Sequence, residues 1–271
     1  MSSIVKTKSG RFIVLENDAL GKVLQTKGDF EPHFLQIVGN IVRPGDLCID
    51  LGANLGYHSV TLARLTGPAG IVLAFEPQRI IFQQLCGNAF LNGLRNIQTF
   101  NAAVGGEDGM IQMDAIDYDR SDINIGCTKV GRGGDSAPMM RLDSLNLENV
   151  KFIKLDIQGC EERFLDGAAA TLAKSRPVMF VEVDEYLLRC FGSSSEQLMN
   201  RLLAMNYVLV RILNDYSCDH LAVPAEQAHL IPRFVKDLPC PHAIIRGRAV
   251  RVHLNHPTHP QAIYGTHEVL V

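Results

Sequence analysis

The sequence contains no run of apolar residues long enough to cross a bilayer, and the polar stretch from Met1 to Arg11 lacks the hydrophobic core of a secretory signal. Its formal net charge is only −3. A nucleic-acid partner usually needs a concentrated basic face, and this balance gives no reason to expect one. We therefore expect a cytoplasmic protein that binds neither a membrane nor a nucleic acid.

The cysteines do not form any C-x-x-C pair, and their number is odd. Scattered thiols of this kind are typical of reduced cysteines in a cytoplasmic protein, most of them filling a core. The seven positions are Cys48, Cys86, Cys127, Cys160, Cys190, Cys218 and Cys240.

The sequence does have ample core material, at 46% hydrophobic residues in a chain of 271. Short apolar runs alternate with segments of helical periodicity, which indicates parallel β–α–β units with helices on both faces. The expected strands are 47–51, 71–75, 97–100, 152–157, 178–183, 207–213 and 221–223, and the expected helices are 56–65, 80–91, 162–173 and 193–205.

This pattern divides the chain into three regions, 1–44, 45–231 and 232–271. Residues 1–44 are expected to be a lead-in with a short strand at 12–15 and a helix at 30–42, and residues 45–231 the main α/β domain. A Gly-, Asp- and Asn-rich insertion, 105–135, interrupts the domain and is expected over the carboxyl edge of the sheet, with a hairpin around 110–115. It is either a lid over an acceptor or a solvated loop.

The C-terminal extension, 232–271, forms either an extra strand pair or an arm that packs on the domain or on a partner chain, which makes a homo-oligomer possible. Its histidines His253, His256 and His259 are spaced by three, but the prolines beside them oppose a regular helix and no cysteine or carboxylate completes a ligand set. We expect no metal site.

A glycine-containing loop, Asp50 to Gly56, joins the first strand of the main domain to its helix, which is where an open α/β sheet binds its ligand. Because Ala53 and Asn54 replace the central glycine of a dinucleotide loop, the loop favours a ligand without a pyrophosphate. The Asp50 carboxylate would attract an ammonium group. Glu76, at the end of the next strand, would accept hydrogen bonds from both ribose hydroxyls.

Five motifs in this order resemble the FkbM-type methyltransferases, over about residues 46–184. They are Cys48 to Ser59, Ala74 to Pro77, Asn88 to Leu94, Asn101 to Gly105, and Lys154 to Glu161 with Leu165 to Ala168. The resemblance implies a class I fold, which is a doubly wound, mostly parallel, seven-stranded sheet with an antiparallel strand near the C-terminal edge. It also implies transfer of a methyl group from S-adenosylmethionine, typically to an oxygen of a sugar, a glycan or another natural product.

The same resemblance assigns the cofactor site. The amino-acid part of S-adenosylmethionine would lie against Asp50, Gly52, Ala53, Asn54, Gly56 and Tyr57, and its ribose against Glu76 and Pro77. The adenine would lie at Asn101, Ala102 and Ala103, and Asp156 would lie near the transferred methyl group.

The chain departs from the family pattern at two positions, since the family usually has Glu where Gln158 stands and commonly His where Asp184 stands. The proton acceptor for catalysis therefore stays open. The candidates at the carboxyl edge are Asp156, Glu161, His58 and Glu182. Glu161 is equally explained by the dipole of the helix it begins, His58 by packing, and Asp156 alternatively as a metal ligand.

Methylation of a small-molecule hydroxyl is the favoured function. One alternative is methylation of nitrogen, carbon or a macromolecule. However, Asp156 to Gly159 replace the Asn-Pro-Pro-Tyr type of motif that base-methylating enzymes carry there. The other alternative is a binding protein that keeps the cofactor fold without turnover, for which Gln158 and Asp184 are the only support.

Overall fold

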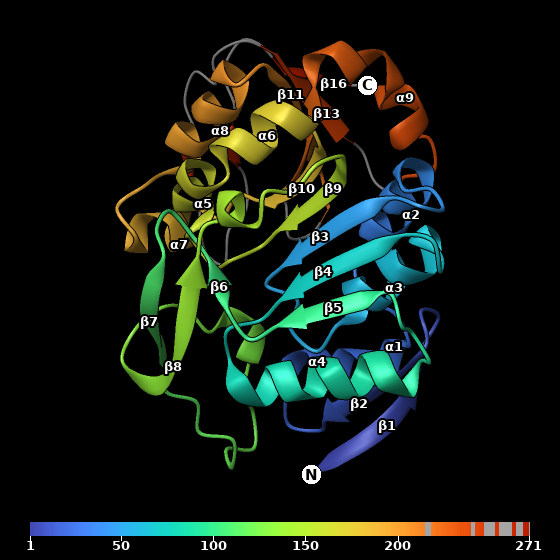
Figure 1. Ribbon diagram of the computed structural model, residues 1–271, viewed down its shortest axis with the longest axis vertical. Helices are drawn as coiled ribbons and strands as arrows, with labels where there is room; N and C mark the ends of the chain where they lie inside the picture. Colours follow the sequence, from blue (N-terminus) through green and yellow to red (C-terminus); the bar gives the residue numbers. More distant parts are fainter. Residues whose placement is uncertain (215–217, 240–241, 247–252, 255–261, 264–267, 271) are drawn as a thin grey trace.

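The structure of the protein, a computed structural model, describes residues 1–214, 218–239, 242–246, 253–254, 262–263 and 268–270. Within these residues, a nine-stranded sheet has the strand order β5-β4-β3-β9-β10-β12-β11-β13-β16 (Figure 1). Its strands are β3 (Leu47–Leu51), β4 (Ile71–Phe75), β5 (Ile97–Phe100), β9 (Val150–Leu155), β10 (Val178–Glu182), β11 (Tyr207–Ile212), β12 (Asp219–Pro224), β13 (His242–Ile245) and β16 (Glu268–Leu270).

The half of the sheet from β5 to β10 is parallel, and β12 then pairs antiparallel with both β10 and β11. This confirms the doubly wound fold, its parallel core and its antiparallel strand towards the C-terminal edge. The predicted number of seven strands is too low, because β13 and β16 of the C-terminal extension add two strands beyond β11. The chain reverses direction across the sheet between β3 and β9, because β4 and β5 extend one side and β9 and β10 the other. Such a switch point opens a crevice at the carboxyl ends of the strands.

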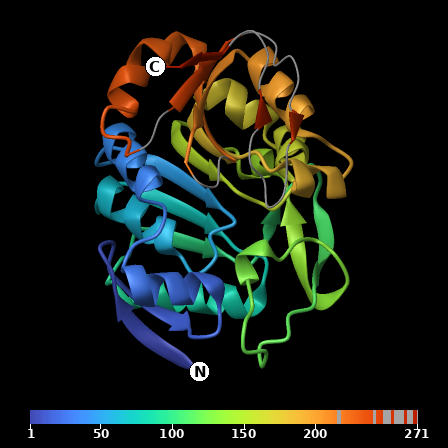
Figure 2. The ribbon, with the colours of Figure 1, turned by 180° about the vertical axis from the view of Figure 1, so that it is seen from behind.

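Helices cover both faces, as the alternating pattern predicts. One face packs against α2 (Pro32–Ile41), α3 (Tyr57–Thr66) and α9 (Ile231–Phe234), through a cluster that includes Phe34, Leu62 and Phe234. The views from the two sides show these helices, with α4 (Arg79–Leu91), along one flank of the sheet (Figures 1 and 2).

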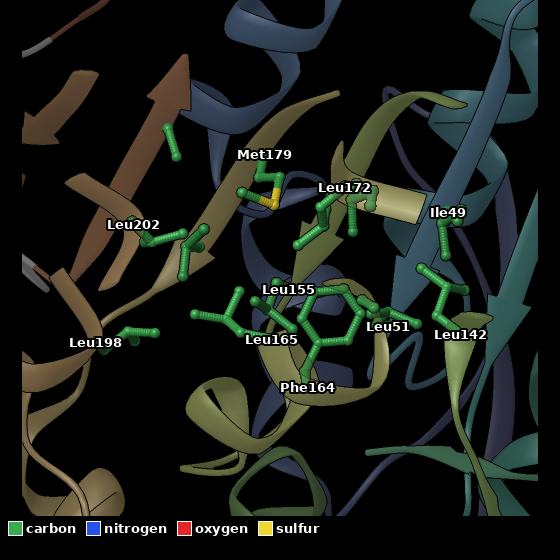
Figure 3. Close-up of a cluster of buried hydrophobic side chains, with 14 of the residues drawn as sticks. Ile49, Leu51, Leu142, Leu155, Phe164, Leu165, Leu172, Met179, Leu198 and Leu202 are labelled. Carbon is green, nitrogen blue, oxygen red and sulfur yellow. The ribbon is translucent and has the colours of Figure 1, made fainter. Parts of the chain in front are cut away.

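The other face packs against α5 (Glu161–Gly167), α6 (Ala169–Ser175) and α8 (Ser195–Ala204). Figure 3 shows part of this cluster, in which side chains of the central strands meet those of the helices: Ile49, Leu51, Leu142, Leu155, Phe164, Leu165, Leu172, Met179, Leu198 and Leu202. Helix α8 begins as the sequence predicts, because the Ser194 side chain accepts a hydrogen bond from the Gln197 amide.

The single helix predicted over 162–173 is wrong, since the chain forms α5 and α6 with a break at Ala168. Two tertiary contacts explain the break. A β-carbon added at Gly167 would lie 1.9 Å from the Gly105 carbonyl oxygen, so the backbone passes close to another segment there. The Asp143 carboxylate then accepts hydrogen bonds from the Ala170 and Thr171 amides at the start of α6.

The insertion forms a three-stranded sheet of β6 (Ala103–Val104), β7 (Gly109–Asp114) and β8 (Gly133–Met140), beside the arrowheads of β3, β4 and β5 in Figure 1. The hairpin predicted around 110–115 is therefore too short, because β7 pairs with the distant β8 rather than with an adjacent strand. The local alternation of residues 110–115 identified one arm but carried no information on its partner.

The lead-in holds more structure than the sequence pattern predicts. Besides β2 (Arg11–Leu15) and α2, it contains β1 (Ser2–Lys6) and α1 (Ala19–Lys27). Helix α7 (Glu185–Cys190) was also missed.

In the extension, β13 pairs with β11 and β16 with β13, while β14 (His253–Leu254) pairs with β15 (Ala262–Ile263). None of the helices in the described ranges is both long and apolar enough to pass through a bilayer.

Candidate functional site

A cavity of about 850 Å³ opens over the carboxyl ends of the parallel strands. The loop after β3 contributes Gly52 to Asn54, the end of β4 contributes Glu76 to Gln78, and the turn after β9 contributes Asp156 to Gln158. The insertion covers part of it with residues such as Met113 and Ile125. The cavity therefore lies where the sequence places the cofactor.

Glycine is required in the loop after β3 by close contacts. Gly52 has φ +73°, and a β-carbon there would lie 1.9 Å from the Asp156 carbonyl oxygen. Gly56 has φ +90° and lies against Leu85 of α4, where a β-carbon would approach to 2.6 Å. Asn54, with φ +50°, is one of the residue types that tolerate this left-handed region. The cavity is lined by Gly52, Ala53, Asn54 and the buried Tyr57. Gly56 does not line the cavity and instead packs against Leu85.

Glu76 forms one end of the cavity. Its two carboxylate oxygens accept hydrogen bonds from the amides of Asn54 and Gln78, at 3.0 and 2.9 Å. Burial raises the pKa of Glu76 to about 7, against the opposing effect of these hydrogen bonds. Each carboxylate oxygen can accept further hydrogen bonds, so the group is suited to a vicinal diol such as that of a ribose.

The residues predicted to contact an adenine, 101–103, have two different roles. Ala102 and Ala103 line the cavity, as does Pro77. Asn101 is not among the lining residues; its side-chain amide donates to the carbonyl oxygens of Glu76 and Pro77, at 2.9 Å each. It therefore positions the backbone next to Glu76.

Asp50 is fully buried and is not among the residues that line the cavity. Its Oδ2 accepts a hydrogen bond from the Ser59 hydroxyl at 2.5 Å, and its Oδ1 lies 3.8 Å from Nζ of Lys154. Burial raises the pKa of Asp50, although Lys154 and Ser59 oppose this. A direct contact between Asp50 and an ammonium group stays a prediction.

Lys154 is a buried cation that the sequence analysis did not identify as functional. It lies opposite Asp50 in the β3–β9 register, 3% of its side chain is exposed, and its Nζ is 2.9 Å from Oδ2 of Asp156. Burial alone would lower its pKa, but Asp156, Asp50 and Glu31 raise it above its usual value. A lysine between the buried apolar residues Ile153 and Leu155 was the available signal.

Asp156, Gln158 and Glu182 form one hydrogen-bonded group at the ends of β9 and β10. The Gln158 side-chain amide donates to Oδ1 of Asp156 at 2.9 Å and to Oε2 of Glu182 at 3.1 Å. Burial by itself raises the pKa of Asp156, but Lys154 and the hydrogen bonds from Gln158 and Glu182 lower it below its usual value. Asp156 is therefore an ionised carboxylate whose oxygens are already engaged.

Gln158 has φ +56° and is followed by Gly159 with φ +96°. The buried Glu161 holds this turn, because its carboxylate accepts hydrogen bonds from the amides of Ile157 and Gly159. Burial raises the pKa of Glu161 to about 7, yet Glu161 does not line the cavity. Its geometry supports a structural role.

The other departure from the family pattern, Asp184, is the N-cap of α7. Its side chain accepts a hydrogen bond from the Leu187 amide at 3.0 Å. Asp184 does not line the cavity. At this position the chain has a helix cap.

Three side chains of the lead-in and α3 line the cavity on the side of Asp219 and Lys154. His58 stacks on Phe30 and Phe34 and lines the cavity, together with Glu31 and His33. Burial lowers the pKa of His58 well below its usual value, so its imidazole is neutral. His58 was predicted from the sequence, whereas Glu31 and His33 were not, because nothing in the lead-in's pattern indicates that it reaches the sheet edge.

His33 bonds to Asp219 at the start of β12, with 2.7 Å between Nε2 and Oδ2. Asp219 also lines the cavity and lies opposite Glu182 in the β10–β12 register. Within the described ranges, no cluster of three or more His, Cys, Asp or Glu side chains has a metal-binding arrangement. His256 and His259 lie outside the described residues, and only the backbone of His253 is described.

The family model of the methyltransferase FkbM domain matches residues 50–209. None of the curated proteins matches the chain.

Three solved structures illustrate the similarity of fold. The methyltransferase FkbM from Methylobacillus flagellatus KT is 19% identical, with a TM-score of 0.47 over 75% of this chain and 53% of that one, so this chain spans about half of its length. The M. jannaschii TYW2 structure in complex with AdoMet is 17% identical, with a TM-score of 0.46 over 82% and 83% of the two chains. An O-methyltransferase from Thermotoga maritima is 14% identical, with a TM-score of 0.43 over 77% and 64%.

Proposed function

This chain belongs to the FkbM family of S-adenosylmethionine-dependent methyltransferases, and we propose that it methylates a hydroxyl group of a sugar, a glycan or another natural-product small molecule. The observation that carries this proposal is the hydrogen-bonded group of Asp156, Gln158 and Glu182 beside the cavity. Carboxylates and amides that line a largely apolar cavity are suited to orienting hydroxyl groups.

The residues present fit the proposed cofactor. Gly52 lets the loop after β3 pass directly against the Asp156 carbonyl, where there is no room for a β-carbon, and both Gly52 and Glu76, with its carboxylate oxygens, line the cavity. S-adenosylmethionine, when bound, supplies a methyl carbon activated by a sulfonium charge. We propose that Glu76 holds the ribose, that Ala102 and Ala103 border the adenine, and that the loop from Gly52 to Asn54 borders the amino-acid part.

The acceptor would then lie over β9 and β10. Asp156 stays ionised through Lys154 and Gln158, so we assign it the orientation of the acceptor rather than the removal of its proton. Gln158 places an amide donor where the family usually has a carboxylate, and it fixes Asp156 and Glu182 relative to each other. Correct alignment of two reactants is the largest contribution that such a site makes to a displacement reaction.

The test is production of S-adenosylhomocysteine from S-adenosylmethionine with a panel of acceptors. The panel contains neutral sugars, polyketide alcohols, amines and an RNA pool, and calorimetry first establishes that S-adenosylmethionine binds. We expect turnover with hydroxylated small molecules. Turnover confined to amines or to RNA would overturn the proposed acceptor class, and absence of S-adenosylmethionine binding would overturn the function as a whole.

A further inference from the structure

Five acidic side chains follow the carboxyl edge of the main sheet in strand order. Glu76 follows β4, Asp50 is in β3, Asp156 follows β9, Glu182 ends β10 and Asp219 begins the antiparallel β12. If Glu76 holds the ribose, the cofactor extends from β4 towards β9, and the remaining part of the cavity, over β10 and β12, is the acceptor end.

Glu31 lies at this acceptor end. It lines the cavity, and 23% of its side chain is exposed. The next turn of its segment is anchored there by the bond between His33 and Asp219. Glu31 precedes α2 at the N-cap position, yet its side chain makes no capping hydrogen bond to that helix. Its carboxylate therefore does not cap the helix, which is the usual role of an acid at this position.

The imidazole of His58 lies close to this carboxylate, and one of its nitrogens has no hydrogen-bond partner among the described residues. Oε2 of Glu31 lies 3.3 Å from Nε2 of His58, at an orientation that does not make a hydrogen bond. His58 is 6% exposed and lines the cavity, and its Nε2 has no hydrogen-bond partner in the part of the chain that the structure describes. A buried nitrogen of this kind is costly unless something bonds to it. A ligand hydroxyl that bonds to both the Glu31 carboxylate and Nε2 of His58 would give this nitrogen a partner.

The backbone at Glu31 is also unusual. Its φ of 45° and ψ of 63° are left-handed, which is rare for a residue with a side chain and is further disfavoured before Pro32. Such a conformation persists only where the surrounding packing imposes it. Here the following residues of α2 impose it, because Phe34 and Ile37 are fully buried against the sheet.

We propose that Glu31 is a catalytic residue, the proton acceptor for the hydroxyl group that is methylated, with Nε2 of His58 positioning that hydroxyl. This inference rests on the proposed function. The acceptor oxygen forms its bond to the methyl carbon as the bond from that carbon to sulfur breaks, and the electron pair of the broken bond stays on sulfur. The hydroxyl proton passes to the Glu31 carboxylate, which later releases it to water. The products are a methyl ether and neutral S-adenosylhomocysteine.

The charges around Glu31 distinguish it from Asp156. Burial raises the pKa of Glu31 well above its usual value, and Asp219, Asp156 and Asp50 add to this while Lys154 opposes it. The neutral imidazole of His58 faces it from α3. The pKa of Asp156 is instead lowered. Two carboxyl groups whose environments separate their pKa values in this way are suited to different roles, one as a proton acceptor and the other as a fixed charge.

A positive charge entering the cavity has a measurable consequence. The sulfonium of S-adenosylmethionine favours the ionised form of a nearby carboxyl group, so its binding should lower the pKa of Glu31 and release protons from it. S-adenosylhomocysteine has the same shape without the charge and should expel less. The number of protons released on binding each ligand is obtained by calorimetry over a series of pH values around neutrality, at each pH in buffers of different ionisation enthalpy.

We expect the wild-type protein to release more protons with S-adenosylmethionine than with S-adenosylhomocysteine, by up to about one. Glu31→Gln should abolish this difference while binding S-adenosylhomocysteine normally. Glu16→Gln, which removes an exposed carboxylate of the same lead-in, should keep it. Glu31→Asp keeps a titratable group and should keep the difference with its pH of maximum displaced.

An equal release with the two ligands in the wild-type protein would overturn the inference, as would an unchanged difference in Glu31→Gln or an undisplaced maximum in Glu31→Asp. Failure to bind S-adenosylmethionine at all would instead overturn the proposed function. Where an acceptor supports turnover, Glu31→Gln should lower kcat by roughly 100- to 10,000-fold, the usual contribution of a positioned base. Its KM for S-adenosylmethionine should change only a few-fold.

Discussion

At the scale of single residues, one buried cation, Lys154, influences the ionisation of several acids at the cavity. Lys154 contacts Asp156 directly and lies opposite Asp50, and both carboxylates are within the same closed environment. A buried charge that keeps its partner is tolerated, whereas one that loses its partner is strongly destabilising. Lys154 therefore sets the ionisation of the residues that face the ligand.

Lys154→Met should destabilise the fold by about 3–5 kcal/mol, because it leaves Asp50 and Asp156 without their cation. Without Lys154, the pKa of each carboxyl group rises in the folded state above its value in the unfolded chain. The folded state then binds protons more readily, so the loss of stability should be larger at pH 8 than at pH 5.5. Urea denaturation at the two pH values measures this.

Lys151→Met is the matched control for that change, since Lys151 belongs to the same strand and is only partly buried. We expect it to alter stability by less than about 1 kcal/mol. A loss in Lys154→Met that is the same at both pH values would contradict the assigned interaction with the two acids.

Glu76 makes ligand affinity dependent on pH. Its pKa of about 7 means that the ionised form, the better acceptor for hydroxyl hydrogen bonds, becomes dominant as the pH rises through neutrality. Affinity for S-adenosylhomocysteine should therefore increase from pH 6 to pH 8. Glu76→Gln should weaken it by roughly 10- to 100-fold and remove the pH dependence. Calorimetric titrations at pH 6 and pH 8 test this. If the affinity of Glu76→Gln for S-adenosylhomocysteine still rises with pH, the Glu76 carboxylate is not the cause of the dependence.

At the scale of elements, the lead-in and the insertion hold each other over the cavity. The Asp18 carboxylate accepts hydrogen bonds from the amide of Gly21, at the start of α1, and from that of Ile125 in the insertion. The Asn17 side chain donates to the carbonyl oxygens of Tyr118 and Arg120. Ile125 also packs with Ile81 of α4. The insertion is thus attached at several points where it borders the site.

Asp18→Ala should release one of these attachments. We expect faster amide hydrogen exchange in residues 117–128 and an affinity for S-adenosylhomocysteine lowered several-fold, together with a loss of about 1–3 kcal/mol for the unpaired buried groups. Ser194→Ala is the control, because Ser194 caps α8 and does not line the cavity. It should cost about 1 kcal/mol without affecting exchange in the insertion. Equal exchange in the two variants would argue against the attachment.

At the scale of the whole molecule, the lead-in is part of the core rather than an appendage. Phe34, Ile37 and Val38 of α2 are fully buried in one cluster with Phe152 of β9 and Val210 of β11. The cavity is equally shared, because His33 of α2 lines it together with Glu182 of β10 and Asp219 of β12.

Removal of residues 1–44 should therefore abolish cooperative unfolding, since it exposes the face that α2 covers and removes Glu31 and His33. A thermal melt followed by circular dichroism tests this, with removal of residues 1–7 as the control. Among the strands that the structure describes, β1 pairs with β2 alone, and it alternates between exposed and partly buried residues, so this smaller truncation should leave a cooperative melt. A cooperative melt of 45–271 would show that the lead-in is dispensable.

The local parts of this protein were determined by the sequence alone. Strands β3, β4 and β5 match their predicted bounds because short apolar runs between turn residues identify buried strands. Glycine at 52 and 56 likewise follows from the positive φ and the close contacts of a strand-to-helix turn. Each of these features depends on a few neighbouring residues, so its signal is contained in one window of sequence.

Only the tertiary structure decided which distant groups meet. His33 and Asp219 are separated by 186 residues, and Lys154 faces Asp50 through the pairing of β3 with β9. The pairing of β7 with β8 and the break at Ala168 also depend on contacts between separate segments. Sequence periodicity states which face of an element is buried but not which element covers it. The cofactor loop was therefore predictable, whereas the acceptor end around Glu31 emerged only from the packing of the lead-in against the sheet.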